Sequence, residues 1–132
     1  MRFIFAIIMK NSLSKSQIEI LKNKGTEPAF SGELLYNDDN GDYRCVGCDN
    51  ILFSSEHKYD SGSGWPSFSD IKSNDSIITK NDYSYGMIRT EVLCKSCNGH
   101  LGHVFNDGPS STGKRYCINS LVLKFDKKWN LL

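Results

Sequence analysis

Four of the five cysteines in this 132-residue chain form two Cys-x-x-Cys pairs, and this pairing constrains the fold more than any other feature. The pairs are Cys45 with Cys48 and Cys94 with Cys97. Each pair can present two sulfurs from a tight turn, so together they can enclose one tetrahedral zinc ion. The fifth cysteine, Cys117, stands alone and lies two residues from Arg115. A lone thiol beside a cation is a candidate nucleophile.

Five cysteines permit two interpretations. One is a secreted, disulfide-bonded domain with one thiol left over, and the other is a reduced intracellular protein with a zinc site. The Cys-x-x-Cys spacing favours the second. Four thiolates leave no open coordination position for water, so the predicted zinc stabilises the fold and takes no part in catalysis. The three histidines, His57, His100 and His103, are then not needed as ligands.

Length and composition indicate one ordinary domain with a modest core. Only 39% of the residues are hydrophobic, so a metal site would add useful stability. The formal net charge of +1 gives neither a basic field for nucleic acid nor an acidic field for cationic partners. We therefore expect no nucleic-acid partner.

One sustained apolar run, residues 3–9 (FIFAIIM), lies near the N-terminus. It is far shorter than the roughly 20 residues that span a bilayer. Arg2 before it hints at a signal peptide, but no small-x-small cleavage site follows. A short strand, a disordered extension and a translation start at Met9 all remain open. We expect a cytoplasmic protein with no membrane partner.

A helix is predicted over about residues 15–24. Ser14 and Gln17 have the spacing of a capping box, Ile18 and Leu21 give the segment an apolar side, and Gly25 ends it. This helix is expected to pack on the domain without taking part in chemistry.

Turns and short strands are predicted for the rest of the chain. Residues 61–66 (SGSGWP) cannot form a regular element, because glycines and a proline interrupt them. Residues 51–53 form a short apolar run, and residues 83–93 and 115–125 are predicted as strands. The predicted fold is mainly β, with two small antiparallel sheets, a short helical N-terminal segment and a four-cysteine zinc site that joins them.

Several blocks of the sequence carry a resemblance to a known family. Residues 64–68 (GWPSF), 99–109 (GHLGHVFNDGP) and 115–120 (RYCINS) occur in that order, after residues 24–32 (KGTEPAFSG). With both cysteine pairs, they resemble the signature blocks of the B-type peptide-methionine (R)-S-oxide reductases. The resemblance covers about residues 14–126. It divides the chain into an N-terminal extension (1–13), a reductase domain (14–126) and a C-terminal tail (127–132).

The resemblance implies an oxidoreductase that reduces methionine (R)-S-oxide, mainly in proteins. Cys117 would attack the sulfoxide sulfur as a thiolate, which Arg115 would favour. On a strand, positions 115, 117 and 119 share a face, so Asn119 could orient hydrogen bonds in the same pocket. His103 is expected to donate the proton to the sulfoxide oxygen, with His100 in a supporting role.

The resemblance also suggests a substrate-binding wall. Trp65 would offer a flat apolar surface to the substrate methyl group, and Phe105 and Asp107 are expected beside it. Asp107 would position either a histidine or the surrounding loop.

The reaction cycle needs an outside reductant. Attack would leave Cys117 as a sulfenic acid. Many members of the family carry a resolving cysteine just before the GWPSF block, where this chain has Ser63. We therefore predict that thioredoxin or a small thiol reduces the sulfenic acid directly, and we expect a monomer.

Two other functions compete with this one. A zinc-containing binding module would have no need for Cys117, both histidines of the 99–109 block and Trp65 together. A nucleic-acid-binding ribbon is disfavoured by the near-zero net charge.

Overall fold

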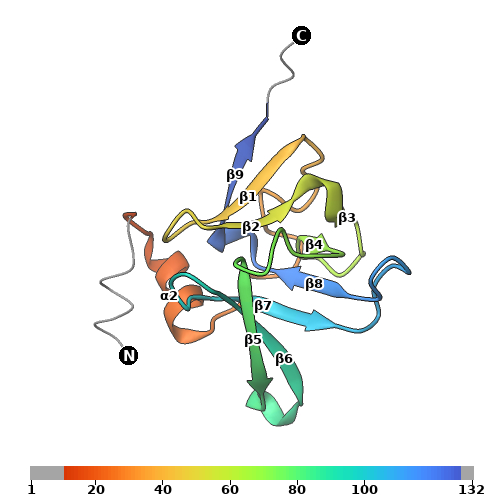
Figure 1. Cartoon of the computed structure of the whole chain (residues 1–132). Helices are drawn as coiled ribbons and strands as arrows, with labels where there is room; N and C mark the ends of the chain where they lie inside the picture. Colours follow the sequence, from red (N-terminus) through yellow and green to blue (C-terminus); the bar gives the residue numbers. More distant parts are fainter. Residues whose placement is uncertain (1–10, 129–132) are drawn as a thin grey trace.

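The computed structural model describes residues 11–128, which form two antiparallel β-sheets and one α-helix (Figure 1). The predicted fold class is confirmed. The apolar run at residues 3–9 lies outside the described residues. Among residues 11–128, no helix has both the length and the apolar character needed to cross a membrane.

The helix α2 (Lys15–Asn23) has the predicted cap. The Ser14 hydroxyl accepts a hydrogen bond from the Gln17 backbone N–H at 3.2 Å, and the Gln17 side chain accepts one from the Ser14 backbone N–H at 2.8 Å. The helix ends because Lys24 adopts a left-handed conformation, with φ of 59°. Ile20 and Leu21 are buried, and the helix packs against β7 (His100–Phe105) and the turn at residues 120–122.

The smaller sheet has three strands in the order β2-β1-β9 and lies at the top of Figure 1. These strands are β1 (Gly41–Cys45), β2 (Ile51–Ser54) and β9 (Leu123–Lys127).

The larger sheet has six strands in the order β3-β4-β8-β7-β6-β5. They are β3 (Lys58–Tyr59), β4 (Ser67–Phe68), β5 (Ile77–Asp82), β6 (Arg89–Cys94), β7 (His100–Phe105) and β8 (Arg115–Ile118). Short 3-10 turns at Ser55–His57, Ser84–Gly86 and Ser120–Val122 complete the regular structure of the described residues.

Aromatic rings from both sheets form part of the core. Phe53 of β2 stacks on Phe68 of β4 with ring centroids 4.3 Å apart, and Tyr43 of β1 meets Phe68 edge-on at 4.9 Å. All three residues are fully buried. These ring contacts pack the three-stranded sheet against the six-stranded sheet.

Two predicted strands were wrong in their extent. Residues 83–93 were expected to form one strand, but Ser84–Gly86 turns the chain and the strand begins only at Arg89. Tyr85 adopts a left-handed conformation in this turn, with φ of 57°. Residues 115–125 were also expected to be continuous. The Ser120–Val122 turn divides them, so β8 lies in the six-stranded sheet and β9 in the three-stranded one.

Candidate active site and metal centre

The four paired cysteines form a buried cluster with the geometry of a metal site. Their sulfur atoms all lie within 4.8 Å of one another. The Sγ atoms of Cys45 and Cys97 are 3.7 Å apart, and those of Cys48 and Cys94 are 3.5 Å apart. Four sulfurs about 2.3 Å from a tetrahedral ion would lie about 3.8 Å from one another. The residues present therefore fit one closed, structural metal site.

Each cysteine pair follows a strand and turns in the same way. The residues after the pairs, Asp49 and Asn98, have φ angles of 67° and 62°. Their backbone N–H groups donate to the carbonyl oxygens of Cys45 and Cys94 at 2.9 and 2.8 Å. Asx residues tolerate this left-handed conformation better than most. Since one turn joins β1 to β2 and the other joins β6 to β7, the metal site links the two sheets.

A second site lies around Cys117, away from the metal ligands in sequence. A cavity of about 110 Å³ opens there. Its lining residues are Thr26, Trp65, Arg89, Gly102, His103, Phe105, Cys117 and Asn119. Five of the predicted site residues are therefore brought together in one cavity. The lining residues do not include Arg115, Asp107 or His100.

Strand register places the thiol opposite an imidazole. Cys117 of β8 pairs with His103 of β7 on one side and with Ser67 of β4 on the other. Directly paired residues of antiparallel strands present their side chains on the same face. Gly102 allows this close approach, because a Cβ atom there would overlap the carbonyl oxygen of Cys117.

The protonation of Cys117 reflects opposing influences. Burial raises the pKa of its thiol above the ordinary value, while Ser63 and Arg115 act to lower it. The Ser63 hydroxyl oxygen lies 3.8 Å from the Cys117 sulfur. Arg115 therefore acts in the predicted direction, but burial outweighs it.

Arg115 is fixed by groups beside the cavity. Its Nε donates to Asp107 at 2.8 Å and its second guanidinium nitrogen does so at 3.2 Å. The guanidinium carbon also lies 4.4 Å from the centre of the Phe105 ring. Asp107 was expected to position a histidine or its loop, but its side-chain partner is Arg115.

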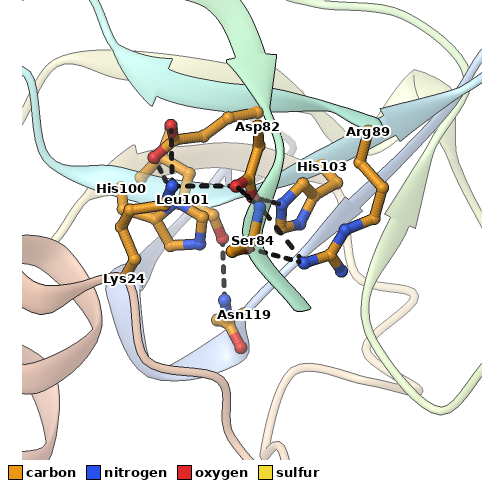
Figure 2. Close-up of polar contacts among 9 residues, drawn as sticks. Lys24, Asp82, Ser84, Arg89, His100, Leu101, His103 and Asn119 are labelled. Carbon is orange, nitrogen blue, oxygen red and sulfur yellow. Dashed lines mark hydrogen bonds and ion pairs between the residues drawn. The ribbon is translucent and has the colours of Figure 1, made fainter. Parts of the chain in front are cut away.

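The two histidines of β7 have different surroundings, as Figure 2 shows. The Nε2 atom of His103 lies 2.7 Å from a carboxylate oxygen of Asp82. Among residues 11–128, this is the only hydrogen bond of that imidazole, and His103 lines the cavity. His100 is only 2% exposed, and its Nδ1 atom lies 2.6 Å from Glu91. Burial lowers the pKa of His100, which favours its neutral form.

Asn119 lies just beyond β8 and anchors a neighbouring loop. Its amide N–H donates to the carbonyl of Leu101 at 3.0 Å, and its amide oxygen accepts from the backbone N–H of Glu27 at 3.0 Å. The Trp65 indole N–H donates to the carbonyl of Glu27, also at 3.0 Å. The segment at Thr26 and Glu27 thus connects two residues that line the cavity.

Sequence reasoning missed several charged residues around the cavity. Arg89 lines it, Asp82 holds His103, and Glu91 holds His100. None belongs to a block that the sequence analysis used. A weak signal existed, because Arg89 and Glu91 are two residues apart in a predicted strand and so share a face.

The third histidine, His57, lies apart from the cavity. His57 is half-buried, and its Nδ1 atom is buried without a hydrogen-bond partner among the described residues. It lies outside the cavity lining.

A closed four-thiolate centre and a separate thiol in a cavity define a thiol-dependent enzyme with a structural metal. The model of the SelR domain family matches residues 13–127 of this chain. Relatives named peptide methionine sulfoxide reductase MsrB support the same assignment. The one from Leptospira interrogans is 56% identical over 119 residues, which cover 90% of this chain and 91% of the relative. The one from Methanosarcina barkeri is 54% identical over 116 residues, which cover 88% of this chain and 82% of the relative.

A mouse relative, from Mus musculus, is named methionine-R-sulfoxide reductase B3, mitochondrial. It is 51% identical over 117 residues, which cover 89% of this chain and 46% of that protein. The chain belongs to the SelR-domain family of methionine sulfoxide reductases. This finding confirms the resemblance noted in the sequence.

Proposed function

We propose that this protein reduces methionine (R)-S-oxide, mainly in proteins, to methionine, with Cys117 as the nucleophile. The supporting observation is the cavity in which the Cys117 thiol faces His103 across β7 and β8, with Trp65 in the lining. The choice of the R epimer follows from the family and from the name of the mouse relative.

The first step transfers oxygen from substrate to enzyme. The Cys117 thiolate attacks the electrophilic sulfoxide sulfur and forms an S–S bond, while the sulfoxide oxygen takes up one proton. The resulting hydroxyl group then moves from the substrate sulfur to the Cys117 sulfur, and the S–S bond breaks with its electron pair left on the substrate sulfur. The substrate sulfur is reduced to a thioether, and Cys117 is oxidised to a sulfenic acid. Methionine then leaves the cavity.

His103 supplies the proton that the sulfoxide oxygen needs. Its Nε2 atom is engaged by Asp82 at 2.7 Å, so a protonated ring would present the Nδ1 proton to the cavity. His100 supports this role by packing against His103, with the two ring centroids 5.4 Å apart. It does not line the cavity itself.

Aromatic side chains are expected to bind the substrate. Trp65 and Phe105 line the cavity and offer apolar surface to the methyl group. Asp107 contributes indirectly, because it holds Arg115, whose guanidinium lies over Phe105.

An outside thiol completes the cycle. Ser63, not a cysteine, lies 3.8 Å from the Cys117 sulfur, and a hydroxyl cannot form a disulfide. Thioredoxin or a small thiol attacks the sulfenic sulfur and releases water, and a second thiol then returns Cys117 to its reduced form.

We assign zinc as the metal of the four-cysteine centre. Cys45, Cys48, Cys94 and Cys97 would hold it, and the donor set of four thiolates is typical of structural zinc. Its contribution is to stability, since no coordination position is left for substrate.

Four cysteines that hold a metal ion in place of disulfide bonds suit a reducing compartment, so we propose a cytoplasmic location. We also propose that the reductase domain covers residues 14–126 and acts as a monomer. Cell fractionation and size-exclusion chromatography test these two assignments.

The test is turnover of the two separated sulfoxide epimers with dithiothreitol as reductant. The wild-type protein should reduce the R epimer and leave the S epimer unchanged. Cys117→Ser should lower turnover at least about 1,000-fold, while its circular dichroism spectrum and metal content stay the same. Full turnover by this variant, or equal use of both epimers, would contradict the proposal.

A further inference from the structure

Two carboxylate–histidine pairs lie side by side on the sheet. Asp82 of β5 contacts His103, and Glu91 of β6 contacts His100. Both carboxylates are almost completely buried, with side chains 2% and 1% exposed. Ionised carboxylates that are close together repel each other and need compensating positive charge.

Lys24 lies between the two carboxylates. Its ammonium nitrogen is 3.0 Å from an oxygen of Asp82 and 3.7 Å from an oxygen of Glu91. Figure 2 shows the Lys24 side chain beside Asp82. Lys24 comes from the C-terminal cap of α2, not from the sheet. The helix was predicted only to pack on the domain. Its C-terminal cap also places a positive charge beside the two carboxylates.

Other charged and titratable groups surround His103 as well. They are Asp82 on β5, Arg89 and Glu91 on β6, His100 on β7, Cys117 on β8 and Lys24 on α2. Arg89 lies 3.6 Å from Asp82, on the carboxylate oxygen that His103 also contacts. Only Lys24 contacts both carboxylates among the described residues.

We propose that Lys24 is a positioning residue for the reductase reaction: it joins the two carboxylate–histidine pairs and sets the pH range over which His103 carries a proton. This inference rests on the proposed role of His103 as proton donor. Asp82 stays ionised in this arrangement, since its contacts with His103, Ser84 and Lys24 lower its pKa.

Removing the ammonium has a definite electrostatic effect. The two carboxylates would then face His103 with less compensation, and their negative field would favour the protonated imidazole. The His103 ring should therefore keep its proton to higher pH. The loss of the ion pair with Lys24 should also make the Asp82 side chain more mobile and so lower kcat.

The experiment uses the intact, metal-loaded protein and three variants. Lys24→Met removes the charge, Lys24→Arg keeps it, and Lys15→Met removes an exposed charge from the same helix as the control. Two measurements are made: the pH profile of kcat for the R epimer, and the midpoint of the His103 imidazole titration by NMR. The chain has only three histidines, so a His57→Gln variant helps to assign the signals.

In Lys24→Met we expect the midpoint and the alkaline limb of kcat to move up by about 0.5 to 1 pH unit. Lys24→Arg and Lys15→Met should follow the wild type within the error of the measurement. Unchanged midpoints in Lys24→Met, with the fold intact by circular dichroism, would overturn the proposal. The NMR arm does not need turnover, so it separates failure of this inference from failure of the proposed reductase activity.

Discussion

At the scale of single residues, the environment of Cys117 sets how readily its thiolate forms. Burial raises the pKa of the thiol, and Ser63 and Arg115 oppose that effect without overcoming it. Reactivity therefore depends on two neighbours as well as on the cysteine itself. Both neighbours can be changed without altering the sulfur.

We predict that Arg115→Met raises the pKa of Cys117 further, because a cation that favours the thiolate is removed. The rate of iodoacetamide alkylation should then reach half its maximum at a higher pH than in the wild type. Mass spectrometry of the peptide that contains Cys117 gives this rate separately from the metal ligands. A midpoint that stays constant or falls would show that Arg115 does not act on the thiol.

Ser63→Cys should give the enzyme a resolving thiol. The Ser63 oxygen is 3.8 Å from the Cys117 sulfur, so a cysteine sulfur there would have to approach by roughly 1.8 Å to form a disulfide of about 2.05 Å. After substrate is added without reductant, the variant should contain a disulfide between residues 63 and 117. Wild type should instead react with dimedone at Cys117.

The matched control is Ser63→Ala, which has no second thiol and should keep the dimedone reaction. If the Ser63→Cys variant still reacts fully with dimedone, the two side chains are not close enough during turnover.

At the scale of secondary-structure elements, the pairing of β7 with β8 brings together His103, the proposed acid, and Cys117, the proposed nucleophile. Gly102 lies next to His103, and the absence of its side chain allows the backbone of Cys117 to approach. The proposed catalytic geometry therefore depends on a residue with no reactive group.

Gly102→Ala should force the two strands apart beside the cavity. A displacement on the order of 1 Å can lower the rate about 100-fold, so we expect a loss of kcat of that size. Ala at the exposed Gly62 meets no atom within 4 Å but has φ of 75°, so it serves as a control for strain alone. Wild-type turnover by Gly102→Ala would mean that β7 and β8 tolerate separation.

The capping box of α2 allows a separate test of stability. Ser14→Ala removes the hydroxyl that accepts from Gln17, which should cost about 1 kcal/mol of unfolding free energy. Urea denaturation measures this loss. The effect on kcat should be small, unlike that of Lys24→Met at the other end of the same helix.

Local patterns predicted some elements better than others. The helix followed from its cap and apolar spacing, and the metal site from the spacing of cysteines. The Ser84–Gly86 turn was missed because Tyr85, and not only glycine, adopts a left-handed conformation there. The strand from residue 115 was predicted too long because its second half pairs with β1, far away in sequence. Asp82 was missed because a lone aspartate carries no local signal for the histidine it contacts.

At the scale of the whole molecule, the metal centre joins the two sheets. One cysteine pair follows β1 of the three-stranded sheet, and the other follows β6 of the six-stranded sheet. Metal binding therefore adds a long-range connection to a chain with a modest core.

Removal of the metal should unfold the domain. A strong chelator applied under reducing conditions should abolish the native circular dichroism signal and the activity together, because the four thiolates would lose their common ion. Added zinc should restore both. A protein that stays folded and active after complete metal loss, measured by atomic absorption, would contradict a structural role for the site.

The strand that carries Cys117 is hydrogen-bonded on both sides, to β4 and to β7. The backbone at Cys117 therefore cannot move outward without breaking two rows of hydrogen bonds. Cys117 is half-buried and lines the cavity, so a molecule that exchanges electrons with it is expected to enter that cavity. We expect small free thiols and slender, protruding peptide tips to reach the sulfur more readily than a broad flat surface.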